Sequence, residues 1–180
     1  MNRERFFALS IAVLAAAFSR LVPHPPNFTP IAAMALFGGA FFSDRRLAFM
    51  VPLMAMIASD FVIGFHPLAP VVYATFLLVV CIGFWIKRHF SPSAIFAGTL
   101  AGSFLFFVTT NFAVWLSGTL YPKTAAGLLT CFVAAIPFFR NTLAGDLVYT
   151  VLLFGLFVWS EKRFPALRAP QRDTGTFSEV

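Results

Sequence analysis

Long apolar runs with almost no charge recur along nearly the whole of this 180-residue chain, and they restrict its fold more than any other feature. Charged residues make up only 11% of the sequence, less than half of the roughly 25% typical of soluble domains. Such a chain cannot cover itself with polar groups, so lipid is its natural solvent. Lipid leaves only helices or closed barrels, and the runs lack a two-residue alternation. The sequence therefore predicts an all-α integral membrane protein.

Six transmembrane helices follow from the apolar runs and the polar or proline-rich segments between them. The predicted spans are residues 6–21, 28–42, 47–65, 71–86, 93–116 and 141–159. The last apolar stretch begins at residue 124 and is too long for one span of about 20 residues, so we expect a short outer helix that ends near Pro137. Residues 1–160 are predicted to form a single domain, and residues 161–180 a disordered cytoplasmic tail. The first span superficially resembles a signal peptide, but we expect it to be retained because its helix pattern continues past Ala17.

The basic residues segregate when the N-terminus is placed in the cytoplasm. Ten of the 13 then lie on the cytoplasmic side, and only Arg20, Lys123 and Arg140 lie on the other. This bias follows the positive-inside rule and accounts for the net charge of +6 without a nucleic-acid partner. A seventh span would put the basic tail outside. Both termini are therefore predicted to be cytoplasmic.

Polar residues concentrate toward the outer ends of the predicted spans. Asp60 and Asp146 lie inside spans, where ionisable groups are costly and are functional candidates by default. His66 and Tyr121 belong to the same outer cluster. The candidate small-molecule site comprises Arg20, His24, Asn27, Phe28, Asp60, Tyr73, Asn111, Trp115, Arg140, Asn141 and Asp146. The alternatives are structural: the two aspartates can pair with Arg20 and Arg140, the asparagines can bond between helices, and Trp115 can be an interfacial aromatic.

The segment 23–30 reads Pro-His-Pro-Pro-Asn-Phe-Thr-Pro and contains four prolines. Prolines stiffen the backbone and prevent helix, so this loop can cover a pocket with little ordering cost. On the first span, Ala8, Ala12 and Ala16 recur every four residues. Such a stripe lets another helix approach closely, either inside the bundle or as an external docking face.

These features together resemble the S-components of energy-coupling factor (ECF) transporters, which are six-helix membrane subunits that bind vitamins or metal ions. Residues 135–146, Ala-Ile-Pro-Phe-Phe-Arg-Asn-Thr-Leu-Ala-Gly-Asp, resemble the stretch that opens the final S-component helix. The segment 23–30 also resembles a family of uncharacterised bacterial membrane proteins. The resemblance implies an S-component-like bundle in the bacterial inner membrane, with Asn141 near the substrate. It also implies that Ala8, Ala12 and Ala16 dock on a transmembrane coupling subunit served by ATPases.

Uptake of a vitamin-like molecule is thus the expected function, with no catalysis, cofactor or metal site. Two alternatives stay open. An independent carrier can load a proton on Asp60 or Asp146. A solitary cobalamin-type transporter can use Cys81 or Cys131 as a cobalt ligand, although a buried free cysteine is usually a packing residue. A membrane enzyme is disfavoured because the sequence has no GxSxG or HExxH motif, and a GxxxxGK[ST] motif for ATP is missing as well.

Overall fold

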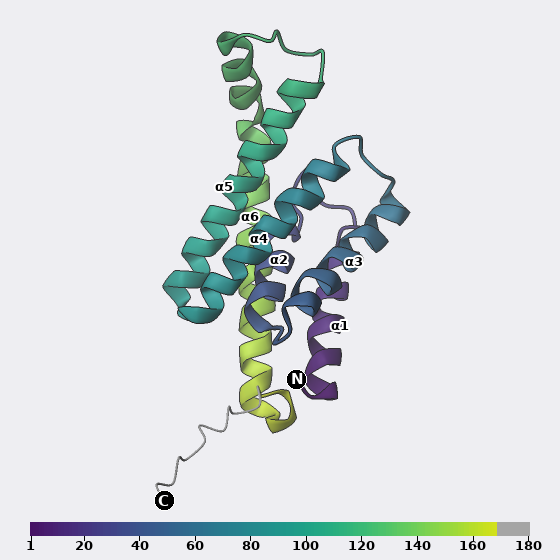
Figure 1. Ribbon diagram of the computed structural model, residues 1–180, viewed down its shortest axis with the longest axis vertical. Coiled ribbons are helices and arrows are strands. Elements are labelled where there is room, and N and C mark those ends of the chain that lie inside the picture. Colours follow the sequence, from purple (N-terminus) through teal and green to yellow (C-terminus); the bar gives the residue numbers. More distant parts are fainter. Residues whose placement is uncertain (169–180) are drawn as a thin grey trace, which may run out of the picture.

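The computed structural model describes residues 1–168 and confirms that this part of the chain is all-helical. The helices are α1 (Arg3–Ser19), α2 (Ile31–Phe41), α3 (Arg45–Ile63), α4 (Ala69–Arg88), α5 (Pro92–Ser117) and α6 (Ala125–Arg163), followed by the short 3-10 helix η1 (Pro165–Leu167). Helices α3 to α6 are long and apolar enough to cross a membrane. The start of α1 and the end of α6 lie at the same end of the bundle (Figure 1).

Helix α2 is the centre of the molecule, although it has only 11 residues. Every residue after Ile31 is buried, and the helix packs against each of the other five (Figure 1). Its crossing with α4 is close because both helices carry glycine at the contact. A Cβ added to Gly39 would lie 2.2 Å from the carbonyl oxygen of Val80, and one added to Gly83 would lie 2.5 Å from that of Leu36. Small residues thus let the two backbones touch.

Helix α6 departs from the sequence prediction. A separate outer helix ending near Pro137 was expected, but α6 continues through Pro137 for 39 residues. At 1.5 Å per residue it is about 58 Å long, nearly twice the apolar thickness of a bilayer. Proline removes one backbone donor without ending the helix here, because α5 supports the same stretch. Cys131 and Ala135 are buried on this stretch, and α5 and α6 extend together beyond the other helices (Figure 1).

The C-terminal end of α2 is closed by aromatic side chains. Phe37 and Phe41 of α2 meet Phe154 and Phe157 of α6, with ring centroids 4.8 to 5.6 Å apart across the two helices. Phe90, just after α4, adds a further edge contact to Phe41 at 5.6 Å. Such tilted and edge-to-face pairs are favourable and leave little space for water.

A buried cation seals this closed end. Arg5 of α1 is only 4% exposed. It donates to the Glu161 carboxylate, to the carbonyl of Leu167 and, at 3.4 Å, to the carbonyl of Phe41, the last residue of α2. Its guanidinium also lies 5.2 Å from the centre of the Phe157 ring. Arg5 therefore places a positive charge at the negative end of the α2 dipole.

The C-terminal boundary lies later than expected. Residues 161–163 complete α6, and η1 follows instead of a disordered tail. The amide of Asn2 donates to the carbonyl of Ala166 at 2.6 Å, so this segment is bonded to the start of α1. The rest of the predicted tail, residues 169–180, lies outside the described residues.

Candidate functional site

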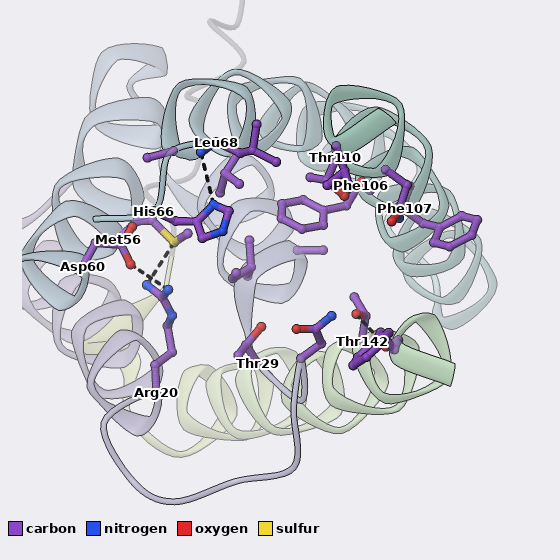
Figure 2. A pocket seen from close by; sticks show the side chains of 18 of the residues that line it. Arg20, Thr29, Met56, Asp60, His66, Leu68, Phe106, Phe107, Thr110 and Thr142 are labelled. Carbon is purple, nitrogen blue, oxygen red and sulfur yellow. Dashed lines mark hydrogen bonds and ion pairs between the residues drawn. The ribbon is translucent and has the colours of Figure 1, made fainter. Parts of the chain in front are cut away.

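A cavity of about 700 Å³ lies beside the N-terminal end of α2. Its walls come from the end of α1, the loop that joins α1 to α2, the α3–α4 connection, and the facing sides of α5 and α6 (Figure 2). Its volume falls in the range of small-molecule sites, about 300 to 1,000 Å³. One wall is ionic and the opposite wall is aromatic.

The proline-rich loop forms one side of the cavity and is fixed to α6; we call residues 21–30 the strap. The amide of Asn141 donates to the carbonyl of Pro26 at 3.0 Å. The Phe28 ring lies 6.1 Å from the Tyr149 ring. Gly145 allows the strap to approach, since a Cβ there would lie 2.9 Å from the backbone nitrogen of Thr29. The strap is thus a fixed wall, consistent with the stiffness predicted from its prolines.

Asn27 occupies the sharpest bend of the strap. Its φ of +64° is in the left-handed region, which asparagine tolerates better than most residues. This conformation lets the chain turn back toward α6, and Asn27 lines the cavity.

The ionic wall is built around Arg20 and Asp60. The two side chains form an ion pair at 2.7 Å, and each is about nine-tenths buried. The Tyr73 hydroxyl donates to the other oxygen of Asp60 at 2.8 Å, and Arg20 donates to the Ser59 hydroxyl at 2.5 Å (Arg20 and Asp60 in Figure 2). The predicted pairing of Asp60 with Arg20 is therefore present, and it lies on the cavity wall.

Asp146 caps α2 from a different helix. One carboxylate oxygen accepts the backbone N–H of Ala32 at 3.0 Å and of Ala33 at 3.4 Å. The other oxygen accepts the Ser103 hydroxyl at 2.7 Å. Pro30, the residue before α2, provides no side-chain cap, so Asp146 supplies both the acceptor and the negative charge that a helix N-terminus favours. The side chain lines the cavity floor but is only 1% exposed.

The aromatic wall was not predicted. It comprises Phe106, Phe107, Phe138 and Phe139, with Thr110 and Thr142 between them. The Phe107 and Phe139 rings lie 4.6 Å apart and join α5 to α6. These four rings could not be selected from the sequence, because 25 phenylalanines are spread over nearly every apolar run.

The structure brings together part of the predicted site. Six of the eleven predicted residues line the cavity: Arg20, His24, Asn27, Asp60, Asn111 and Asp146. His66 lines it too. Tyr73 and Phe28 support the walls from behind, and Asn141 holds the strap.

Two predicted residues have other surroundings. Arg140 is exposed and forms no ion pair with Asp146, so the suggested pairing of these two was wrong within the described chain. Trp115 donates to the carbonyl of Pro122 at 2.9 Å, and the Lys123 ammonium lies 5.5 Å from the centre of its ring. Trp115 therefore fixes the α5–α6 turn outside the cavity.

The alanine stripe lies at the edge of the buried face of α1. Ala16 is buried, and Ala8 and Ala12 are half-buried against the core. The exposed face of α1 instead carries Phe7 and Ile11. Ala16 therefore packs inside the bundle, which was the first of the two roles considered for the stripe.

Neither cysteine lines the cavity. Cys81 is exposed on the surface between α4 and α5, and the Cys131 thiol lies 3.5 Å from the carbonyl oxygen of Asn111. Within residues 1–168, no three histidine, cysteine or acidic side chains are grouped to hold a metal ion.

Comparison with known protein families yields a match to this chain. A search of curated proteins and a search of solved structures found nothing similar. The match is to the family described as "Family of unknown function (DUF6580)", and it covers residues 1–167. Because it covers nearly the whole chain, the protein belongs to this DUF6580 family.

Proposed function

We propose that this protein binds a small, vitamin-like molecule in the cavity beside α2 and takes part in its uptake across the bacterial inner membrane, as an S-component-like subunit. The observation that carries the proposal is the cavity itself. It has the volume of a ligand site, its walls come from several segments between Arg20 and Asp146, and it combines an aromatic wall with convergent polar groups. In a helical bundle with only a structural role, we would expect side chains to fill this space, because protein interiors are close-packed.

Six crossings with both termini in the cytoplasm are part of this proposal. The bond between Asn2 and Ala166 supports it, because an even number of crossings returns the chain to its starting side. The ten-to-three distribution of basic residues supports it independently. On this topology the closed end of α2 faces the cytoplasm and the cavity faces outward, where a scarce nutrient arrives.

Energy for uptake would come from a transmembrane coupling subunit with ATPases, since this sequence has no phosphate-binding motif of its own. The half-buried Ala8 and Ala12 remain the proposed docking positions on α1, together with the exposed apolar face beside them. Replacement of Ala12 by leucine is expected to weaken co-purification of a coupling subunit and to leave ligand binding intact.

The other transport mechanisms have less support. A proton-loaded carrier requires Asp60 or Asp146 to exchange partners, and both carboxylates are held by fixed donors. A cobalt-ligating cysteine would have to face the cavity, and neither Cys81 nor Cys131 lines it.

Native mass spectrometry of the protein from its own host tests the proposal. A small molecule bound one-to-one is expected, and it should be lost in Thr110→Trp, which places an indole in the cavity. Thr130→Trp is the matched control, because Thr130 is an exposed threonine of α6 outside the cavity. A ligand-free protein from every growth medium, or a ligand retained in Thr110→Trp, would contradict the proposal.

A further inference from the structure

The fixed charges that line the cavity already have partners in the protein. Within residues 1–168 the cavity wall contains one guanidinium, Arg20, and two carboxylates, Asp60 and Asp146. Arg20 and Asp60 pair at 2.7 Å; Arg20 also donates to the Ser59 hydroxyl and, at 3.4 Å, to the Met56 sulfur, and Asp60 accepts from Tyr73. Among the described residues the Nε of Arg20 has no hydrogen-bond partner, and this atom is buried.

Asp146 is occupied in the same way. Its oxygens accept two backbone N–H groups of α2 and the Ser103 hydroxyl, and the side chain is 1% exposed. A ligand cation could reach this carboxylate only by displacing donors that α2 needs at its N-terminus. A charged ligand group would therefore enter the cavity without a partner, or would have to break an existing pair.

The groups that remain for a ligand are neutral hydrogen-bonding side chains. The Nδ1 of His66 accepts the backbone N–H of Leu68 at 3.1 Å, so the proton of a neutral ring is on Nε2, which is a donor. The Nδ1 of His24 lies 2.6 Å from the carbonyl of Val22 and must donate to it, so a neutral His24 leaves Nε2 as an acceptor. The two histidines thus present opposite hydrogen-bonding character.

Asn111 adds a further acceptor. Its amide nitrogen donates to the carbonyl of Phe107 at 2.7 Å, and no side chain or backbone group in residues 1–168 donates to its side-chain oxygen. The Phe106 ring, on the aromatic wall opposite Arg20 and Asp60, supplies an aromatic contact (Figure 2).

From this arrangement we propose that the cavity selects ligands with no net charge that combine a flat ring with both a hydrogen-bond donor and an acceptor. This inference rests on the proposed function and narrows it, because it excludes carboxylates, phosphates and quaternary ammonium compounds. The Arg20–Asp60 pair is then a specificity element: it keeps both charges satisfied and rejects ions of either sign.

Three probes of nearly the same shape test the inference: benzamide, benzoate and the benzamidinium cation. Binding is measured by thermal stability and ligand-observed NMR in lipid nanodiscs at about pH 8, where imidazole is neutral in water. The deciding variant is Asp60→Asn, which leaves the Arg20 guanidinium unpaired in the cavity. Wild type should reject benzoate, and Asp60→Asn should bind it at least about tenfold more tightly.

The double variant Arg20→Gln/Asp60→Asn is the control for partition into lipid, and it should lose the gain in benzoate binding. If Asp60→Asn does not fold, Tyr73→Phe replaces it. That variant frees one Asp60 oxygen and should gain binding of benzamidinium.

Wild type that binds benzoate or benzamidinium as well as benzamide would overturn the inference. So would an Asp60→Asn variant that folds and gains no benzoate binding. If native mass spectrometry finds no ligand while Asp60→Asn still gains benzoate, the proposed function fails and the charge selectivity of the cavity stands.

Discussion

Each end of α2 is stabilised by a charged side chain from another helix, but the surroundings of the two ends differ. At its N-terminus, Asp146 of α6 provides a carboxylate to the free N–H groups; at its C-terminus, Arg5 of α1 provides a guanidinium to the carbonyl of Phe41. Each charge complements the helix dipole. The N-terminal end, however, borders a cavity of about 700 Å³, whereas the C-terminal end is packed with aromatic rings.

This comparison shows why a buried helix of 11 residues can be stable. A short apolar helix exposes eight unpaired backbone groups at its two ends, and in lipid these must be satisfied by protein. Charges from α1 and α6 satisfy some of them and fix α2 between those helices. The N-terminal end of α2 can then border an open cavity without losing the groups that cap it.

Loss of the cation at the sealed end should have the largest effect. Arg5→Ala leaves Glu161 and two carbonyls without their buried donor, at an end where the Phe41 and Phe157 rings pack around the guanidinium. We expect a loss of about 3 to 5 kcal/mol in the free energy of unfolding, measured in mixtures of mild detergent and SDS. A loss below that of Asp146→Ala would contradict the contrast between the ends.

Removal of the carboxylate at the open end should cost less. Asp146→Ala deprives two backbone N–H groups and Ser103 of their acceptor, but water in the cavity can reach them. A loss of about 2 to 3 kcal/mol is expected in the same assay. A variant that does not fold would show that the cavity floor is as dry as the sealed end.

Removal of the Asp146 charge alone should lower the free energy of unfolding by less than removal of the whole carboxylate. Asp146→Asn keeps an oxygen that can accept the N–H groups of Ala32 and Ala33, but it loses the interaction of a full charge with the α2 dipole and the acceptor of the Ser103 hydroxyl. We expect a loss of about 1 kcal/mol, with Ser103→Ala as the matched control for the second oxygen. Equal losses in Asp146→Asn and Asp146→Ala would mean that charge, and not hydrogen bonding, caps α2.

The strap should respond most weakly. Asn141→Ala removes the bond to Pro26, while the Phe28 and Gly145 contacts remain. A loss of about 0.5 to 1 kcal/mol is expected, together with faster hydrogen exchange of the strap amides. Unchanged exchange would show that the prolines alone hold the strap in place.

The fold class was predictable because the hydropathy of a segment indicates whether lipid or water surrounds it. The apolar runs, and the polar or proline-rich segments between them, located α3, α4 and α5 to within a few residues. The continuity of α6 through Pro137 was not predictable, because it depends on support from α5, and a local rule for proline contains no information about neighbours.

The candidate site was predictable only as a cluster. Rarity of ionisable residues in apolar runs identified Asp60 and Asp146. It could not distinguish an ion-pair partner from a helix cap, since Asp146 bonds to residues 113 and 114 positions away. The positive-inside rule counted Arg5 as an ordinary cytoplasmic charge, although its side chain is buried and its partner Glu161 lies 156 positions along the chain.

Thiol labelling tests the central claim most directly: one end of the bundle is an open cavity and the interior toward the other end is sealed. In a Cys81→Ser/Cys131→Ser background, Thr142→Cys lies in the cavity, whereas Thr150→Cys is buried further along the same helix. In intact spheroplasts, a membrane-impermeant maleimide should label Thr142→Cys and spare Thr150→Cys. Equal labelling of the two, or labelling of Thr142→Cys only in inverted vesicles, would contradict this account.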